Sequence, residues 1–234
     1  MAGFGATTDP WSFVETGINL VSTSPSPRTG SAAQAGDSRG DVLDETIYDT
    51  GTTDEATYEV CPGKTVEFYD TSDTAHEYDF RLGKVIDSKV ITSIAVNRSS
   101  TEIMQVVIGG ENCPSADSAV AKFIPVFPTG FLAGGKNAVA AGISVTAGRV
   151  ITSSVTNSAQ VSKGLDSGGA QACKDIYAGR AESTNELVSS DTAPAATADT
   201  ANGWALTPGQ TSGESNTGYP TASIGSFQNL TRDT

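Results

Sequence analysis

The stretch that decides the fold is KVIDSKVITSIAVNRSSTEIMQVVIG, residues 84–109. Apolar side chains alternate with polar ones along residues 90–96 and again along 104–108, which is the period of two typical of β-strands. The polar residues 97–100 lie between the two runs, so the pattern predicts an antiparallel hairpin with a loop of about four to five residues. Both faces of this hairpin carry apolar side chains, and we therefore expect it to be central in a sandwich or barrel, or covered by a neighbour.

Strand patterns continue on both sides of the hairpin. Residues 56–61 and 65–69 alternate in the same way around a Pro62-Gly63 turn. Residues 119–127 predict a further strand, since this mostly apolar run ends at a Pro-Thr-Gly turn.

Three more segments towards the C-terminus read as strands. Residues 137–145 and 149–156 predict a pair around a turn at 146–148. Residues 175–190 fit a strand better than a helix, because a helix would have no apolar stripe. As a strand, this segment places on one face Arg180, Glu182, Thr184 and Glu186, and on the other Ala181, Ser183, Asn185 and Leu187.

These patterns predict a mainly β protein: an antiparallel β-sandwich or barrel with an extended N-terminal arm, long loops and at most one short helix. Residues 1–54 are expected to form the arm and loop region, because most of this part is rich in Pro, Gly and small polar residues. Residues 55–190 are expected to form the β core. Residues 191–234 are expected to be loop-rich and to return to the core through Ile224, Phe227 and Leu230.

The balance of charge restricts the function. The 234 residues include 14 Lys and Arg against 27 Asp and Glu, a formal net charge of -13. Nucleic-acid binding usually depends on clustered Lys and Arg, and anionic membrane surfaces attract the same residues, so both kinds of docking are disfavoured. The charge is also unevenly spread, at -12 over residues 1–80, +4 over 81–180 and -5 over 181–234. Opposite patches of this kind suit contacts between copies, although a solvated acidic face is the simpler explanation.

The three cysteines, Cys61, Cys113 and Cys173, are odd in number and widely spaced. The favoured interpretation is three reduced thiols in a protein made in a cytoplasm, and the alternative is one disulfide plus a free thiol. A zinc site is not expected, because there is no CxxC motif and His76 is the only histidine. The N-terminus lacks the basic and apolar regions of a signal peptide, and no run approaches the length of a membrane span.

Two clusters of carboxylates were weighed as sites. The first is DVLDETIYDTGTTDE, with Asp41, Asp44, Glu45, Asp49, Asp54 and Glu55, and it lacks the ligand order of a calcium loop, so a solvated acidic face is favoured. The second surrounds His76 with Asp70, Asp73, Glu77 and Asp79. A histidine held by carboxylates can act as a base, with Ser72 or Thr74 as a nucleophile, but a turn with a solvated or paired histidine is favoured.

Shorter motifs have ordinary explanations. The doublets Gly109-Gly110, Gly134-Gly135 and Gly168-Gly169 lack the spacing of a phosphate-binding loop and are interpreted as turn glycines. Glycosylation sequons begin at Asn97 and Asn229, and an Arg-Gly-Asp tripeptide spans residues 39–41; neither carries a function here. The sequence therefore predicts no catalytic residue, no cofactor-binding residue and no metal ligand.

In style the chain resembles phage or prophage virion structural proteins, and most of all tail tube proteins. The resemblance rests on KVITSIAVNRSSTEIMQVVIGG (89–110), KDIYAGRAESTNELVSS (174–190) and GWALTPGQTSGESNTGY (203–219). It implies a sandwich or barrel with arms that assembles into stacked rings, and it assigns no role to any single residue.

The resemblance implies a non-enzymatic virion protein made in a bacterial cytoplasm. Its partners would be copies of itself and other virion proteins, with DNA only as passing cargo and no membrane. Because duplex DNA carries a charge every ~1.7 Å, an acidic inner wall would let it slide. We expect the acids of residues 41–79 on that wall and the basic middle of the chain at contacts between rings.

Three other functions stay open. One is a head decoration or capsid-associated protein. Another is a β-sandwich adhesin or receptor-binding module, which would show an exposed aromatic patch. The third is a hydrolase that uses the cluster around His76.

Overall fold

The computed structural model describes residues 9–27, 31–36, 42–48, 52–69, 79–113, 122–165, 171–208, 211–214 and 218–233. In this part of the chain one large antiparallel sheet contains ten strands. Its main path runs β1 (Ile18–Pro27), β4 (Thr52–Val60), β7 (Gln105–Asn112), β6 (Lys89–Ser99), β10 (Arg149–Leu165), β11 (Gln171–Val188), β15 (Pro220–Asn229) and β13 (Ala205–Leu206). Off this path β14 (Thr211–Glu214) pairs with β15, and β5 (Val85–Ile86) pairs with β6.

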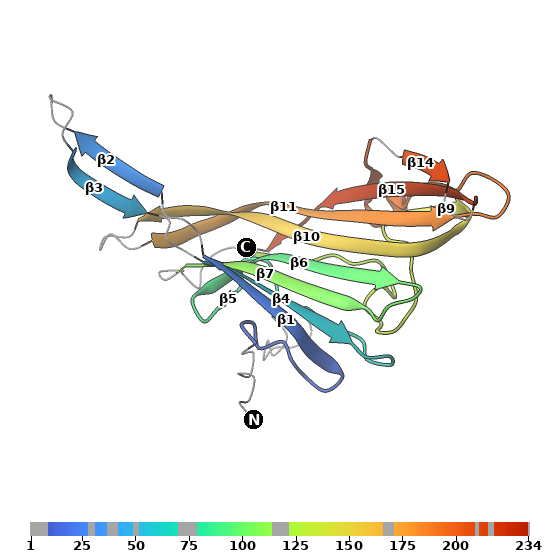
Figure 1. Cartoon of the computed structure of the whole chain (residues 1–234), viewed down its shortest axis with the longest axis horizontal. Coiled ribbons are helices and arrows are strands. Elements are labelled where there is room, and N and C mark those ends of the chain that lie inside the picture. Colours follow the sequence, from blue (N-terminus) through green and yellow to red (C-terminus); the bar gives the residue numbers. More distant parts are fainter. Residues whose placement is uncertain are drawn as a thin grey trace.

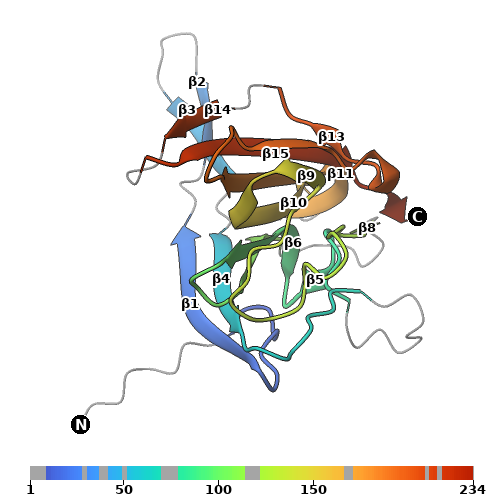
Figure 2. The ribbon, with the colours of Figure 1, turned by 90° about the vertical axis from the view of Figure 1, so that its right-hand side faces the viewer.

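The sheet is strongly twisted and open. β10 and β11 run along most of the length of the molecule, with β6, β7, β4 and β1 beside them (Figure 1). From the side, the sheet curls from β1 and β4 at one end to β11 and β15 at the other (Figure 2). Its outermost described strands, β1 and β13, do not pair with each other. Of the two expected architectures, the structure is therefore sandwich-like and not a closed barrel.

The hairpin of residues 84–109 is confirmed as β6 and β7. Ile94 pairs with Ile108 and Val96 with Val106, which brings the expected alternating sets face to face. The two strands lie between β4 and β10, so the expectation of a central hairpin is also confirmed. The ladder extends to Asn97, which pairs with Gln105, so the loop starts later than expected.

The main core lies under one face of the sheet and is closed by irregular segments. Residues 61–69, 79–84 and 124–142 cross beneath the strands with little regular structure of their own. Residues 65–69 make only isolated bridges, and within 119–127 the described strand is β8 (Lys122–Phe123), which pairs with β16 (Arg232–Asp233). Val66 and Phe68 are nevertheless buried, so their apolar alternation marks the core without marking a regular strand.

The N-terminal residues belong partly to this core, which differs from the expected arm over 1–54. Trp11 and Phe13 are buried, and the Phe13 ring lies 5.0 Å from Tyr58 and 4.9 Å from Phe80. The Asp9 carboxylate accepts the backbone N–H groups of Trp11, Phe13 and Val14 and so folds the segment into a turn under the sheet.

An arm-like element does follow. β2 (Ser31–Gly36) and β3 (Val42–Tyr48), which follow β1 and precede β4 along the chain, form a separate two-stranded sheet. This hairpin projects past the end of β10 and β11 (Figure 1).

The expected pairing of residues 137–145 with 149–156 is wrong. β9 (Ile143–Ala147) pairs instead with β12 (Ala195–Ala198). Gly142 and Gly148 flank β9 with φ angles of 63° and 88°, which favour glycine and let the chain turn at both ends. β9 and β12 pack over β11 and β15 in a second apolar cluster of Ile143, Leu187, Ala222 and Ile224.

The C-terminal segment returns to the sheet as β15, which pairs with β11. Ile224 and Leu230 are buried as expected, whereas Phe227 is half-buried, with the Arg180 guanidinium over its ring. The described part of the chain contains a single short helix, the 3₁₀ turn Thr200–Asn202, and no helix there has the length and apolarity to cross a membrane.

Candidate assembly surface

The face of the sheet opposite the main core is polar across five neighbouring strands. On β11, inward Ala181, Ser183, Asn185 and Leu187 are buried while Glu182, Thr184 and Glu186 are exposed, which confirms the expected alternation. The neighbouring strands follow the same rule, with small or polar outward residues on β4, β7, β6 and β10: Glu55, Thr57, Glu59, Gln105, Ser93, Asn97, Thr152, Ser154 and Thr156. We call this surface, together with Val107, Glu111, Arg180, Glu182, Thr184 and Glu186, the outward face.

Carboxylates are spread over the outward face. Glu55 and Glu59 lie on β4, and no ion pair is seen for either in the described part of the chain. Glu182 pairs with Arg180 at 3.1 Å, and Glu186 accepts a hydrogen bond from Thr152 Oγ1 at 2.9 Å. Of the acidic cluster considered in residues 41–55, Asp54 pairs with Lys89 at 3.4 Å and Glu55 is exposed. The outward face is therefore acidic, and its acidic residues come from two distant parts of the chain, β4 and β11.

Asp41 and Asp49 of that cluster lie outside the described residues. Asp44 and Glu45 lie in β3. Among the described residues no group of His, Cys, Asp and Glu is arranged to hold a metal ion.

An open groove of about 480 Å³ crosses the outward face beside the β6–β7 loop. Its lining is dominated by hydroxyl, amide and carboxylate groups: Asn97, Ser99, Thr101, Glu102, Gln105, Thr152, Ser154, Thr184 and Glu186, with Arg98, Ile103 and Ser153. It contains no aromatic ring and is shallow, which is unlike the mostly apolar, enclosed pockets that hold small molecules.

Two buried asparagines attach the covering layer to the inner face of the sheet. Asn157 on β10 accepts the N–H of Val126 at 2.8 Å and donates to its carbonyl at 3.2 Å. Asn185 on β11 does the same with Ala141, at 2.8 Å and 2.9 Å. Each asparagine side chain therefore makes the two hydrogen bonds that a neighbouring β-strand would otherwise make. The backbone N–H and C=O of one residue in the irregular covering layer are thus hydrogen-bonded without a second sheet. This role was not predictable from the sequence, in which the only signal is an asparagine at an inward position of a strand.

Arg98 is the most unusual buried residue. It is 3% exposed, and in the described part of the chain no carboxylate faces it. Its guanidinium donates to the carbonyls of Phe131, Ala133 (2.7 Å) and Asn137 (2.9 Å) and to Asn137 Oδ1. Burial lowers the pKa of Arg98 from its usual value. These bonds fix the 131–137 loop against β6 and give Arg98 a structural role.

The cluster considered around His76 is only partly described. Asp70, Asp73, His76 and Glu77 lie outside the described residues. Asp79 is buried and accepts from Arg81 Nε at 2.7 Å and Lys84 Nζ at 3.1 Å, while Arg81 also pairs with Asp233. Burial alone would raise the pKa of Asp79, but the hydrogen bonds from Arg81 and Lys84 outweigh it and lower the pKa to about 2. This carboxylate is a structural ion-pair partner and, held as an anion, is a poor proton carrier.

The glycine doublets differ in position. Gly109 and Gly110 lie inside β7 and not in a turn, so the expectation of turn glycines is wrong for this doublet. A Cβ at Gly109 would lie 2.5 Å from Ser93 Oγ, and a Cβ at Gly110 would meet the Trp11 ring, so both positions need glycine. Gly134 and Gly135 lie in a bend as expected, and Gly168 and Gly169 are outside the described residues, as is the Arg-Gly-Asp tripeptide. Both sequon asparagines, Asn97 and Asn229, are exposed.

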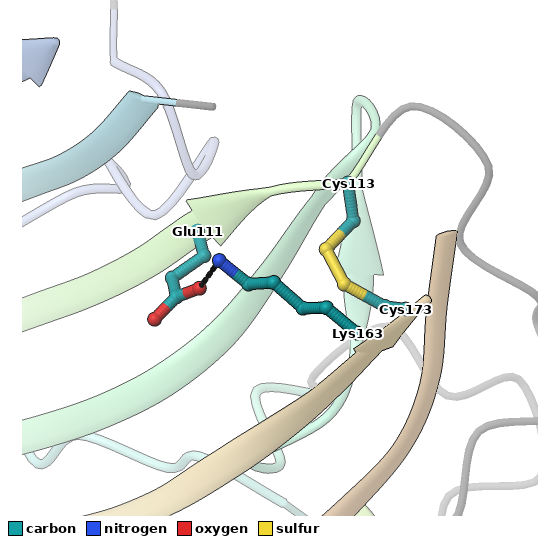
Figure 3. Close-up of a disulfide and its surroundings, with 4 residues drawn as sticks. All are labelled: Glu111, Cys113, Lys163 and Cys173. Atoms are coloured by element: carbon teal, nitrogen blue, oxygen red, sulfur yellow. Dashed lines mark ion pairs between the residues drawn. A yellow bond between two sulfur atoms is a disulfide. The ribbon is translucent and has the colours of Figure 1, made fainter. Parts of the chain in front are cut away.

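Two of the three cysteines form a disulfide, which corrects the expectation of three reduced thiols. Cys113 follows β7 and Cys173 lies in β11, with their Cα atoms 5.7 Å apart, a distance that suits the bond. Cys61 is free and half-buried. Close by, Lys163 Nζ pairs with Glu111 at 2.5 Å and joins β10 to β7 (Figure 3). The sequence could not show this pairing, because the cysteines are 60 residues apart.

Exposed large apolar side chains are scattered. In the described part of the chain they are Val14, Val21, Tyr177 and Tyr219. Tyr177 lies on β11, whereas Tyr219 precedes β15 at the far end of the sheet, so these two rings form no common patch.

Comparison of the chain with models of protein families and with curated proteins found no match to either.

Proposed function

We propose that this chain is a non-enzymatic, self-assembling virion structural protein, and that it forms the tube of a phage tail as stacked rings around a DNA conduit. The observation that carries the proposal is the outward face, a broad, polar and acidic sheet surface without an enclosed pocket. A wall of a conduit needs such a surface, because it must stay hydrated and must repel the phosphates that pass it.

Of the acids of residues 41–79 expected on the inner wall, Glu55 and Glu59 lie on the outward face, whereas Glu67 lies on the covering layer and Asp79 is buried. We therefore restrict the proposed wall to the acids of the outward face. Glu55 and Glu59 come from the acidic front of the chain, while Glu182 and Glu186 come from β11. All four lie on the outward face, so we assign this face to the lumen. Carboxylates act over about 8 Å at physiological salt, so the repulsion is useful only in a narrow bore.

The contacts between copies would use the projecting elements. The β2–β3 hairpin extends away from the body, and β10 and β11 continue beyond the strands that flank them (Figure 1). Lone two-stranded hairpins are marginally stable in water, which favours their packing against a neighbouring copy.

Among the alternatives, a head decoration or capsid-associated protein is the second candidate, because it would use the same projecting hairpins. An adhesin is less well supported, since the exposed aromatic side chains of the described residues are scattered. A hydrolase is less well supported, since Asp79 is already engaged by Arg81 and Lys84.

The test is negative-stain electron microscopy of the purified full-length chain over a range of concentration and salt. The proposal predicts rings or tubes with a hollow centre. A monodisperse monomer under all conditions would overturn it, and a flat lattice or a species that binds only to preformed shells would favour the decoration protein.

A matched pair of variants tests the face. Replacing Glu55 by Lys on the outward face should leave tubes that retain added duplex DNA at low salt. Glu67→Lys, on the covering layer at the opposite side, should not. Equal DNA retention by the two variants would contradict the assignment of the lumen.

A further inference from the structure

The distal part of the β10–β11 hairpin leaves the sheet. β10 pairs with β6 only from Thr152 to Ser158, and β11 pairs with β15 only from Arg180 to Val188. In the described part of the chain, residues 160–165 and 171–177 then pair only with each other. We call this two-stranded extension the ribbon.

A bend separates the ribbon from the sheet. Ser158 pairs with Arg180 and Gln160 with Tyr177, so Ala159 faces the two residues Ala178 and Gly179. Ala178 has a φ of 54°, an uncommon conformation for a residue with a side chain, which marks a bulge. The bulge is therefore the point at which the ribbon turns away from the sheet while the ladders of the sheet stay intact.

The contacts that hold the ribbon against the body differ between its base, next to the bend, and its tip. The disulfide joins Cys173 of the ribbon to Cys113 after β7, and Lys163 pairs with Glu111 of β7 (Figure 3). The apolar contacts are of two kinds. Ile176, next to the bend, is fully buried in the main core, and nearer the tip Val161 and Val85 pack around Val90 and the two cysteines. At the bend, Asp175 pairs with Arg232 between half-exposed side chains, a contact that is weak in water.

We propose that the Cys113–Cys173 disulfide is a redox-sensitive latch that fixes the ribbon to the end of β7. When the cysteines are reduced, the part of the ribbon beyond Ile176 is held by two ion pairs and a small apolar cluster, and it loosens from the end of β7. When they are oxidised, the ribbon is fixed. The inference does not rest on the proposed tube.

Because the sulfur atoms are buried, the ribbon must open before the cysteines can exchange with an external disulfide or reductant. Cys113 is 0% and Cys173 1% exposed in the closed form, so an external oxidant or reductant reaches them only when the ribbon is open. The oxidant we name is a small-molecule disulfide. One cysteine thiolate attacks it, forms a mixed disulfide and displaces one thiolate. The second cysteine thiolate then attacks the mixed disulfide and displaces the other thiolate, so two electrons pass to the oxidant and two thiols are released.

The experiment is hydrogen exchange on the full chain equilibrated with either oxidised glutathione or a phosphine reductant. Reduction should lower the protection of amides in residues 162–165 and 171–175 by about tenfold or more, and leave Ile176, β6, β7 and residues 180–188 protected. The double variant Cys113→Ser with Cys173→Ser should resemble the reduced protein under both conditions. Cys61→Ser is the matched control and should respond to reduction as the unchanged chain does.

Three results would overturn the latch. One is equal protection of the ribbon in the oxidised and reduced chains. The second is a loss of protection that spreads through β6 and β7, because the disulfide would then hold the whole fold. The third is three free thiols by mass spectrometry after oxidation. None of these outcomes bears on whether the chain assembles, which microscopy reports separately.

Discussion

At the scale of the residue, a few buried polar side chains hold an irregular covering layer under a regular sheet. Arg98 satisfies three backbone carbonyls, and Asn157 and Asn185 each satisfy both backbone groups of one residue. Removing such a partner leaves buried carbonyls or amides without water, which costs more than the hydrogen bond itself contributes.

Arg98→Met tests the strongest of these contacts. The apolar stem can still pack, but the carbonyls of Phe131, Ala133 and Asn137 lose their donor. We expect the free energy of unfolding in urea to fall by about 3 kcal/mol. The control is Arg149→Met at an exposed position, which should change stability by less than about 0.5 kcal/mol. Equal effects of the two variants would show that the loop is held by other contacts.

Asp79 predicts a dependence of stability on acid. Its folded pKa of about 2 lies below the unfolded value of 3.8, so its contribution is fully present above pH 4. It is lost as the pH falls from about 4 to about 2, and it amounts to roughly 2 kcal/mol. Asp79→Asn should lower stability at pH 7 by that order, and its difference from the unchanged chain should shrink between pH 4 and pH 2 in thermal unfolding. A difference that is constant with pH would refute the ion-pair account.

At the scale of the element, the sequence predicts strands whose alternation is a local property. β6, β7 and β11 were predicted, together with the outward set Arg180, Glu182, Thr184 and Glu186, because one face of each strand is buried throughout. Pairing between distant segments was not predictable in the same way. β9 pairs with β12, about 50 residues further along the chain, and neither short segment contains a sequence pattern that indicates this partner.

The same limit applies to the candidate site and the N-terminus. Glu55 and Glu59 were expected to share a wall, and they do share a face, but the neighbours that extend this face come from β11. Trp11 and Phe13 lie in a segment without regular structure, so their burial depends on the turn that Asp9 closes.

Gly179 tests the bulge that bends β11. A Cβ at this position would lie 2.5 Å from the Phe123 ring, which is itself buried. We expect Gly179→Ala to lower the free energy of unfolding by about 1–3 kcal/mol, because either the ring or the bulge must move. The matched control, Gly213→Ala in β14, would meet only Thr221 Oγ1 at 3.7 Å and should have little effect. The measurement is the free energy of unfolding of both variants in urea. An unchanged free energy for Gly179→Ala would contradict close packing of Phe123 against the bulge.

At the scale of the whole molecule, the two surfaces of the large sheet differ in character. The inner surface is closed by loops that three polar side chains hold in place. The outward face is open, polar and acidic, and it is the surface that the proposed tube turns towards its cargo. Glu55, Glu59 and Glu186 on this face contribute to the net charge of -13, and in the proposed tube they would repel DNA.

The measurement that tests this central claim most directly is an electron-microscopy reconstruction of the assembled particle. The account predicts a hollow ring or tube in which β4, β7, β6, β10 and β11 turn the outward face to the lumen, with Glu55, Glu59, Glu182 and Glu186 along its wall. A particle whose lumen is lined by the covering layer of residues 61–69 and 124–142, or whose lumen is cationic, would contradict it.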